Sequence, residues 1–459
     1  MARRSGIYGF FLEKRHRNLN STKIIAMVFA GIILLGTLLL MLPAASRSGV
    51  SCGFRPALFT ATSATCVTGL VLYDTWSQWS GFGQAVILAL IQIGGLGFMS
   101  AATMVVFLLR RRVGLKQRMV MAQALSLNDM DGVERLQKLV LIGSFSVEAA
   151  GALILTLRFL PAVGLKTAVK WGVFHAVSAF CNAGFDIFGS FAPGQNMIPF
   201  QSDPVVLLTV SALVVIGGLG FLVWQEVATV RSFRKCSVYT KLVLVTTAVL
   251  LAAGTALIAL LEWNNPGTLG PLGWGDKLLN SFFQSVTVRT AGFVSVDQAA
   301  LTEAGKAVSI LLMLVGGSSG STAGGIKTVT VMVLLLFLRT RIRGRDSVCV
   351  FRRTIPDKQV MDAMTIASLV TGLAIFGAVF VAATSPFSFI DALYETASAI
   401  ATVGLSAGGS ANLSVAAQFM IILYMYFGRV GVLTISLGFL MGSRAEERFE
   451  YAPTNLLIG

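Results

Sequence analysis

Long apolar runs separated by short polar or basic stretches dominate this chain. The clearest runs cover residues 24–42, 85–109, 205–224, 242–261 and 364–384. About 20 apolar residues cross a bilayer as one helix, whereas the strands of a membrane β-barrel alternate apolar and polar residues over about 10 positions. The pattern therefore predicts an all-α polytopic membrane protein.

A fourfold internal repeat lies within this pattern. Four stretches rich in small and hydroxyl residues end in a glycine and an apolar residue: SATCVTGL (63–70), SAFCNAGF (178–185), SVTVRTAGF (285–293) and SAIATVGL (398–405). Their glycines are spaced by 115, 108 and 112 residues: Gly69, Gly184, Gly292 and Gly404. A second glycine motif follows after 25, 33, 24 and 24 residues: Gly94, Gly217, Gly316 and Gly428. Two motifs in register predict four copies of one unit.

Each unit has the same predicted order of elements. A long apolar helix precedes a shorter helix, the glycine motif and a second long helix. The short helices are predicted at residues 54–64, 168–180, 275–288 and 387–400. At about 1.5 Å per residue they reach about halfway through the hydrocarbon. We therefore expect eight transmembrane helices and four re-entrant half-helices around a central pore.

The repeat also predicts where the units begin and end. A cytoplasmic N-terminal segment is expected at 1–21 and repeat 1 at 22–118. The remaining units are repeat 2 at 119–235, repeat 3 at 236–345, and repeat 4 with a cytoplasmic C-terminus at 346–459.

Positive charge lies beside the apolar runs. Five clusters hold 27 of the 36 Lys and Arg residues: 3–23, 110–138, 231–241, 327–358 and 444–448. Lys and Arg concentrate in cytoplasmic loops, so this distribution indicates a multi-pass protein of the cell membrane with both termini in the cytoplasm. It favours topology over nucleic-acid binding as the reason for the net charge of +15.

Composition supports the membrane assignment and gives little sign of an enzyme. Of the 459 residues, 55% are apolar and 12% charged, against about 25% charged in a soluble domain. The five cysteines have no paired spacing and the two histidines lie far apart, so neither a disulfide framework nor a zinc site is predicted. The apolar segments contain no paired carboxylates and no nucleophile–base pair. The first apolar run is too long for a signal peptide and is expected to be retained.

The four glycine stretches predict an ion filter. Non-helical backbone at membrane depth is tolerated where protein buries it or where it lines water. Glycine allows positive φ, so the backbone can turn carbonyl oxygens towards an ion and replace its hydration shell. Neighbouring hydroxyls are expected to add oxygens or to pin the loops from behind: Thr65, Thr68, Thr290 and Thr402. The alternative, that the glycines are only helix–helix contacts, is weaker for four motifs in register.

The predicted filter comprises four residues in each repeat, ending at the glycine. They are Cys66, Val67, Thr68, Gly69, Cys181, Asn182, Ala183, Gly184, Arg289, Thr290, Ala291, Gly292, Ala401, Thr402, Val403 and Gly404. A cation directed into a cation filter would block it. Arg289 is therefore expected to point away from the pore and to brace the backs of neighbouring loops.

The third repeat carries a glycine-rich break that predicts a gate. Where repeats one and two have IGGLGF, repeat three has GGSSGSTAGGIKT (316–328). Glycine costs about 1 kcal/mol relative to alanine inside a helix, so a loop across the pore is expected at 316–325. A flexible helix kink is the alternative. The predicted gate residues are Gly316, Gly317, Ser318, Ser319, Gly320, Ser321, Thr322, Ala323, Gly324, Gly325, Lys327 and Arg429.

Two kinds of charged residue complete the predicted pathway. Arg429 lies inside an apolar run, where an unpaired charge is costly, and we expect it to bind carbonyls of the third-repeat loop. Three acids follow the glycines: Asp74, Asp186 and Asp297. Asp186 is the predicted outer-vestibule residue that attracts cations. For Asp74 and Asp297, helix capping is an equally good interpretation.

These motifs resemble the superfamily of K⁺ transporters that includes the Trk, Ktr and HKT proteins. The four filter stretches, GGSSGSTAGGIKT and FGRVGV (427–432) are most similar to those of the KtrB membrane subunits. The resemblance implies K⁺ uptake through one pore per subunit, K⁺ held by filter carbonyls, and an intramembrane gating loop. It also implies that the arginine at 289 is shared. The filter stretches differ from one another, so a Na⁺-permeable or weakly selective transporter is the alternative.

The resemblance also implies partners. It predicts a homodimer and a cytosolic KtrA-like ring of RCK domains, which would bind the nucleotide in place of this chain. The basic stretches 110–137 and 339–357 are the expected docking segments. Membrane lipid and transported K⁺ are the other expected partners. No tightly bound cofactor is predicted, and Na⁺ is a possible coupling or activating ion.

Overall fold

The fold is described from a computed structural model, which defines residues 21–97 and 133–431. The predicted N-terminal segment, the ends of the chain and most of the 110–137 docking stretch lie outside these residues. The cytoplasmic placement of the termini therefore stays a prediction.

The first two predicted repeats each contain a long helix, a short helix and a broken second helix. Repeat 1 consists of α1 (Ser21–Met41), α2 (Phe54–Thr65), α3 (Thr75–Gln78) and α4 (Gly81–Leu96). Repeat 2 consists of α7 (Val133–Phe180), α8 (Pro204–Leu219) and α9 (Phe221–Val230). Helix α7 changes direction at Gly164, where φ is +74°, so its last part is the short helix predicted at 168–180.

The last two repeats follow the same order, with a small hairpin between them. Repeat 3 consists of α10 (Val238–Glu262), α11 (Trp274–Thr287), α12 (Glu303–Leu314) and α13 (Thr328–Ile342). The antiparallel hairpin pairs β1 (Cys349–Val350) with β2 (Arg353–Thr354), with Cys349 opposite Thr354. Repeat 4 consists of α14 (Asp357–Thr384), α15 (Phe389–Ile400) and α16 (Val415–Val430).

The second helix of every unit begins at a side-chain cap. The capping oxygens belong to Ser80, Asp203, Thr302 and Ser414. Such a cap accepts a hydrogen bond from a free backbone N–H of the first turn and stabilises a helix by about 1 kcal/mol. The polar residue before each apolar run thus sets the start of the helix.

The second helices also break, which the sequence patterns did not predict outside the third repeat. Helix α8 ends at Gly220, where φ is +94°, and α9 continues at an angle of 93°. The expected continuous helix at 205–224 is therefore wrong. Helices α4 and α16 end in the same way at Gly97 (φ +82°) and Gly431 (φ +97°). A glycine in the left-handed conformation ends a helix at little steric cost. The break is thus a general feature of the units, and the third repeat has a longer one.

These breaks shorten the apolar helices. In the described part of the chain, three helices are long and apolar enough to cross a membrane: Lys138–Phe180, Val238–Glu262 and Asp357–Thr384. The bent pair Pro204–Leu219 and Phe221–Val230 adds a fourth if it is one span. The all-helical membrane architecture is confirmed, whereas the total of eight spans stays a prediction.

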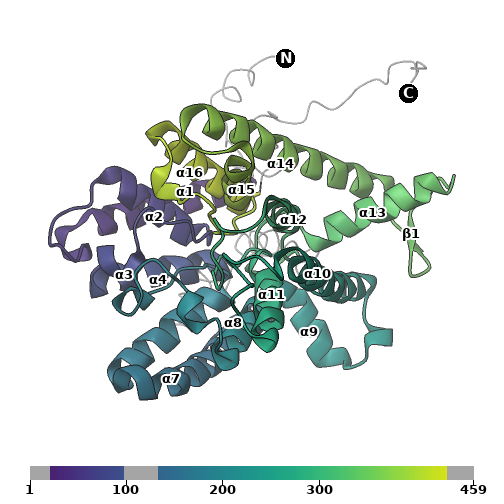
Figure 1. Ribbon diagram of the computed structural model, residues 1–459. Helices are drawn as coiled ribbons and strands as arrows, with labels where there is room; N and C mark the ends of the chain where they lie inside the picture. The colour runs from purple at the N-terminus through teal and green to yellow at the C-terminus, as the bar shows by residue number, and fades with distance from the viewer. Residues whose placement is uncertain (1–20, 98–132, 432–459) are drawn as a thin grey trace, which may run out of the picture.

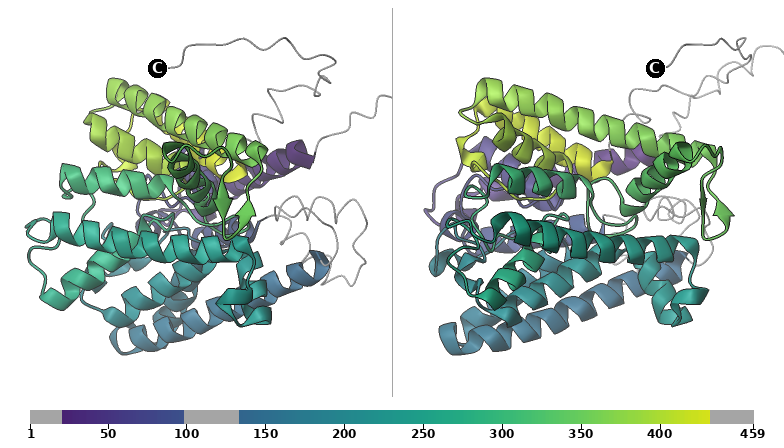
Figure 2. Two further views of the ribbon diagram at one scale, coloured as in Figure 1. Left: turned by 90° about the vertical axis from the view of Figure 1, so that its right-hand side faces the viewer. Right: turned by 45° about the vertical axis from the view of Figure 1, so that its right-hand side comes forward.

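The units pack in a closed order around a common centre (Figure 1). Contacts between units join α4 to α7, α8 to α11, α12 to α15, and α16 to α2. Each second helix therefore packs on the helix that carries the next filter stretch. The long helices α7, α10 and α14 share a common direction, and the β1–β2 hairpin projects at one end (Figure 2).

Candidate functional site

The four glycine stretches have the same unusual backbone. In each, the glycine has a positive φ, and so does the residue two positions before it: Val67 (+56°), Asn182 (+59°), Thr290 (+69°) and Thr402 (+52°). Positive φ is rare for β-branched residues and marks sites where the surrounding structure imposes a conformation. Alternating left- and right-handed residues turn successive carbonyl groups to one side of the chain, as an ion-binding backbone requires.

The four glycines form a closed ring. A Cβ atom on Gly184 would lie 2.8 Å from the Ala291 carbonyl oxygen, and one on Gly292 would lie 2.6 Å from the Val403 oxygen. The other two glycines approach the next stretch even more closely, Gly69 at Ala183 and Gly404 at Thr68. The backbones of repeats 1, 2, 3 and 4 therefore meet in cyclic order, at distances that exclude any side chain at the glycine.

Hydroxyl groups of the short helices hold these backbones from behind. Ser63 Oγ accepts from the Gly69 amide, and Ser398 Oγ from the Gly404 amide, both at 3.0 Å. Ser178 and Thr287 donate to the carbonyl of the residue after the glycine, Phe185 and Phe293, each at 2.7 Å. The bracing residues thus lie further from the glycine than the sequence suggested.

The hydroxyls predicted to pin the loops include three that do not. In the described part of the chain, the buried hydroxyl oxygens of Thr65, Thr68 and Thr402 have no hydrogen-bond partner. Buried polar groups in proteins are nearly always paired, so three unpaired hydroxyls at one site mark a place suited to an ion or water. The prediction that they pin the loops is wrong for these three.

The second glycine motif allows close packing under the ring. A Cβ on Gly94, Gly217 or Gly428 would collide with a carbonyl group at the end of a short helix, that of Thr65, Phe180 or Ile400. These carbonyls occupy the same position in their repeats, four residues before the filter glycine. In the third repeat, Gly316 meets the Gly324 carbonyl instead, because the chain folds back on itself there.

The segment 316–325, here called the intramembrane segment, is not helical. It lies between the end of α12 at Leu314 and the start of α13 at Thr328, and Val315 pairs with Ile326 in a parallel bridge. The prediction that this stretch is a loop is confirmed. The opposing strands close the loop at its base, so it projects as a unit from the third repeat.

The intramembrane segment binds the second repeat through its backbone. The Ser318 amide donates to the Gly218 carbonyl at 3.0 Å, and the Gly320 carbonyl accepts from the Phe221 amide at 2.9 Å. Thr322 Oγ1 donates to the Phe180 carbonyl at 3.0 Å, at the base of the second filter stretch. These bonds use backbone groups that the break in α8 leaves free.

The same segment also meets the fourth repeat. A Cβ on Gly324 would lie 2.9 Å from the Ala401 carbonyl oxygen and would collide with Thr402 Oγ1. The segment therefore extends from the base of the second filter stretch to that of the fourth.

Arg429 joins three repeats. Its Nη1 donates to the Thr322 carbonyl at 2.5 Å, and its Nη2 donates to the carbonyls of Gly95, at 3.0 Å, and Gly94. The side chain thus lies inside the protein, and the expectation that it binds the third-repeat loop is confirmed. The acceptors in the first repeat were not expected. They are available because α4 ends at Leu96 and leaves its last carbonyls without helical partners.

The other two basic residues of the site also point at the intramembrane segment. Arg289 is 8% exposed, and its Nη2 lies 3.5 Å from the Gly316 carbonyl, which it contacts as a donor. Its Nε has no partner among the described residues. Lys327 Nζ donates to the Ala323 carbonyl at 2.8 Å. Arg289 thus contacts the loop of its own repeat.

The three acids after the glycines have different surroundings. Asp74 caps α3 through the Ser77 amide, and Asp297 accepts from the Ala299 amide at 2.9 Å, so both satisfy local backbone. Asp186 accepts from Asn196 Nδ2 at 2.8 Å, and Asn196 also lies 3.4 Å from the Gly184 carbonyl. Burial, with the nearby Asp74 carboxylate, raises the pKa of Asp186 to about 7.

Sequence reasoning missed a set of buried polar side chains behind the filter. Glu148 of α7 accepts two bonds from Gln92 Nε2, at 3.0 and 3.1 Å, next to Cys181. A second set joins repeats 3 and 4: Gln284, Gln298 and Tyr394. A carboxylate or amide within an apolar run is the signal that could have identified them, because such groups are costly unless paired.

The comparisons with known proteins agree with this architecture. The family model described as "TrkH: Cation transport protein" matches residues 13–449. The chain belongs to the TrkH family of cation transport proteins.

Among similar proteins, the potassium/sodium uptake protein NtpJ of Enterococcus hirae is 37% identical over 98% of this chain and 99% of the relative. The Ktr system potassium uptake protein B of Bacillus subtilis is 39% identical over 93% of this chain and 94% of the relative. The crystal structure of the potassium transporter TrkH from Vibrio parahaemolyticus has a TM-score of 0.71 and 16% identity, covering 93% of this chain and 86% of that one. The resemblance to Trk and Ktr proteins is therefore confirmed, and this TrkH family member has the TrkH fold.

Proposed function

We propose that this TrkH family member takes up K⁺ across the cell membrane through a pore formed by its four filter stretches. The observation that carries the proposal is the closed ring of Gly69, Gly184, Gly292 and Gly404, with left-handed residues two positions before each glycine. Backbone carbonyls can replace the hydration shell of K⁺. The relatives named for potassium uptake supply the ion.

The intramembrane segment is the proposed gate. It lies at the base of the second and fourth filter stretches, and Arg429 binds its Thr322 carbonyl. In the closed state, the segment blocks ions sterically and Arg429 adds positive potential. Few side chains have to move for opening, because most bonds of the segment to the second repeat come from backbone groups.

A Na⁺-permeable transporter is the second candidate. The residues before the filter glycine differ in all four stretches, and one relative is named a potassium/sodium uptake protein. Selectivity by carbonyl rings depends on the number and order of the coordinating oxygens, so four unlike stretches support a weaker preference for K⁺.

The wider assembly follows from the resemblance. We propose a homodimer in the cell membrane, with cytoplasmic termini and a cytosolic KtrA-like ring that carries the nucleotide. The C-terminal end of α13 and the β1–β2 hairpin present exposed arginines to such a ring. Na⁺ is assigned a coupling or activating role in this proposal, and no cofactor is assigned to the chain itself.

Flux measurements test the proposed function. Purified protein in liposomes should take up ⁸⁶Rb⁺, and external K⁺ should compete more strongly than Na⁺. Equal competition would support the Na⁺-permeable alternative. No uptake by folded protein, with or without its partner ring, would overturn both.

A further inference from the structure

A buried hydrogen-bond network joins the third and fourth repeats beside the filter. Tyr394 Oη of α15 donates to Gln298 Oε1 at 2.7 Å. Gln298 and Gln284 of α11 exchange two bonds, at 2.6 and 3.1 Å, and Gln298 Nε2 also donates to the Val296 carbonyl at 2.6 Å. Tyr394 and Gln284 are fully buried and Gln298 is 2% exposed.

The amide of Gln298 is fully used. Its oxygen accepts two hydrogen bonds and its nitrogen donates two, which is the full capacity of this group. A buried polar network with every group paired fixes one arrangement, since any displacement leaves a polar atom without a partner. The strand that leaves the third filter stretch is therefore held in place at Gln298.

This arrangement is particular to one boundary of the ring. Tyr394 lies ten residues before its filter glycine, where the other repeats have Phe59, Phe174 and Phe282. Gln284 lies eight residues before its glycine. The other repeats have shorter side chains there: Ala61, Ala176 and Thr396. The hydroxyl and the amide that make the network are thus absent at these positions elsewhere in the fourfold pattern.

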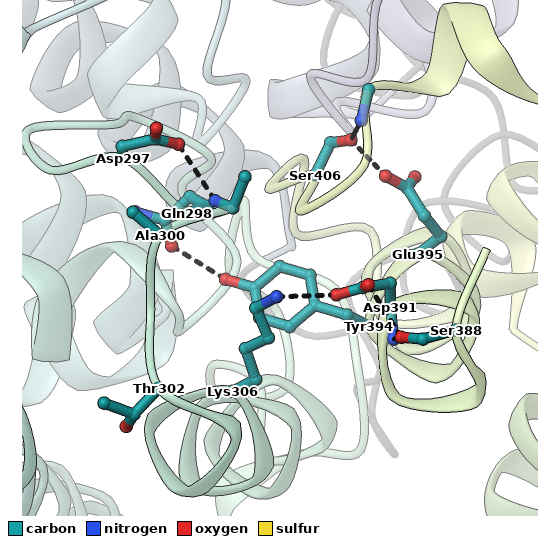
Figure 3. A network of polar contacts seen from close by, with 12 residues as sticks. Asp297, Gln298, Ala300, Thr302, Lys306, Ser388, Asp391, Tyr394, Glu395 and Ser406 are labelled. Carbon is teal, nitrogen blue, oxygen red and sulfur yellow. Dashed lines mark hydrogen bonds and ion pairs between the residues drawn. The ribbon is translucent and has the colours of Figure 1, made fainter. Parts of the chain in front are cut away.

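The network spans the boundary where two filter stretches touch. Gly292 approaches the Val403 carbonyl across this boundary. The ion pair between Lys306 Nζ of α12 and Asp391 of α15, at 2.7 Å, fastens the same two repeats further out (Figure 3). Figure 3 shows Tyr394 reaching from α15 to Gln298, between the ion pair and the strand that follows the third filter stretch. The ion pair joins helices, whereas Tyr394 holds the filter strand itself.

We propose that Tyr394, through Gln298 and Gln284, is a positioning residue that sets ion selectivity at the boundary of the third and fourth filter stretches. The proposal rests on the proposed function and deepens it. A carbonyl site that favours K⁺ over the smaller Na⁺ must resist contraction, and a fixed spacing between adjacent stretches supplies that resistance. Without the Tyr394 hydroxyl, the third strand is free to shift towards the pore.

The test compares two tyrosines that each lose one hydroxyl. Tyr394→Phe removes the bond to Gln298, whereas Tyr424→Phe removes an equally short bond, 2.7 Å to the Leu373 carbonyl, between α16 and α14. Tyr424 is 4% exposed, so the two substitutions are closely matched in burial. The measured quantity is the ratio of the Na⁺ and K⁺ concentrations that halve ⁸⁶Rb⁺ uptake into proteoliposomes.

We expect Tyr394→Phe to lower this ratio by about two- to tenfold, the range for one buried hydrogen bond, and Tyr424→Phe to leave it unchanged. Gln284→Leu should lower the ratio as well, and the double variant Tyr394→Phe/Gln284→Leu should lower it less than the two effects combined. An unchanged ratio in Tyr394→Phe, or an equal fall in both tyrosine variants, would overturn the proposal. Wild-type uptake without any K⁺ preference would also overturn it, whereas absent uptake would instead overturn the proposed function.

Discussion

At the scale of single residues, the filter depends on backbone conformations that most side chains disfavour. Each filter glycine combines a positive φ with close contact to the next stretch, so a methyl group is excluded twice, by strain and by space. The residue two positions earlier carries a side chain despite its positive φ, because that side chain does not point at the neighbouring stretch. The ring thus requires glycine at only one position in each repeat.

Gly292→Ala should weaken discrimination between K⁺ and Na⁺ by about tenfold, since displacement of the Val403 carbonyl costs on the order of 1–3 kcal/mol. Gly372→Ala is the matched control, because Gly372 lies in α14 and a Cβ there meets no atom within 4 Å. Competition by Na⁺ and K⁺ against ⁸⁶Rb⁺ uptake measures the effect. Wild-type discrimination in Gly292→Ala would contradict the role given to the ring.

Asp186 should make K⁺ uptake sensitive to external pH near neutrality. Its pKa is raised to about 7 by burial and by Asp74, so the carboxyl is largely neutral below pH 7 and charged above it. A charged vestibule attracts cations, and we therefore expect the apparent affinity for Rb⁺ to rise between about pH 6 and pH 8. The same shift means that ionisation of this group destabilises the fold over that range.

The pH test uses Asp186→Asn in cells that lack other K⁺ uptake. This variant should show a flat profile over the range in which the wild-type affinity rises. Asp297→Asn serves as the control, since Asp297 is exposed and binds only local backbone. If Asp186→Asn kept the wild-type pH dependence, the vestibule assignment would be wrong.

At the scale of elements, broken helices supply the bonding groups of the proposed gate. The ends of α4 and α8 leave carbonyls free, and these accept from Arg429 and from the intramembrane segment. A continuous helix in either position would have used those carbonyls internally. The glycines at the breaks are therefore as important to the gate as the loop itself.

Deletion of residues 317–324, or Arg429→Ala, should raise flux in the absence of a partner ring by about tenfold, because a bias of about 1.4 kcal/mol shifts a two-state equilibrium that far. Ion selectivity should change little, since neither variant removes a filter residue. Arg158→Ala is the control, as it breaks only an exposed ion pair with Asp203. Wild-type flux in both gate variants, with folded protein, would return the segment to a packing role.

At the scale of the whole molecule, the four units share one pore but differ in their outer parts. The cyclic order of contacts brings the filter stretches together, whereas α13 and the β1–β2 hairpin project from one end (Figure 2). Three arginines lie at this projecting end: Arg341, Arg343 and Arg345. Their positions are suited to a cytosolic partner that pulls on α13 and thereby on the intramembrane segment.

Replacement of Arg341, Arg343 and Arg345 together by glutamine should weaken binding of a KtrA-like ring by about tenfold or more, since rim charges mainly steer association. Dimerisation of the membrane subunit should be unaffected. The control replaces a second basic cluster, Arg231, Arg234 and Lys235, after α9. Equal losses in the two triple variants, measured by pull-down, would show that the effect is general electrostatic attraction.

The sequence by itself determined the class of protein, the short helices and the positions of the filter glycines. Apolar run length and a repeated motif carry this information, because both depend on local properties: the width of a bilayer and the freedom of glycine. The predicted short helices at 54–64, 275–288 and 387–400 lie within one residue of α2 and α11 and within two residues of α15 at each end. The family resemblance rests on the same local motifs.

Only the tertiary structure decided which groups meet. The bonds from Arg429 to Gly94 and Gly95 join residues more than 330 positions apart, and those from Tyr394 to Gln298 join residues 96 apart. Neither pairing has a local signature, because hydrogen-bond partners are set by the closed packing of four units. The breaks at Gly97, Gly220 and Gly431 were hidden for a related reason: an apolar run shows that a segment is buried in a membrane, but neighbouring units decide whether its backbone stays helical.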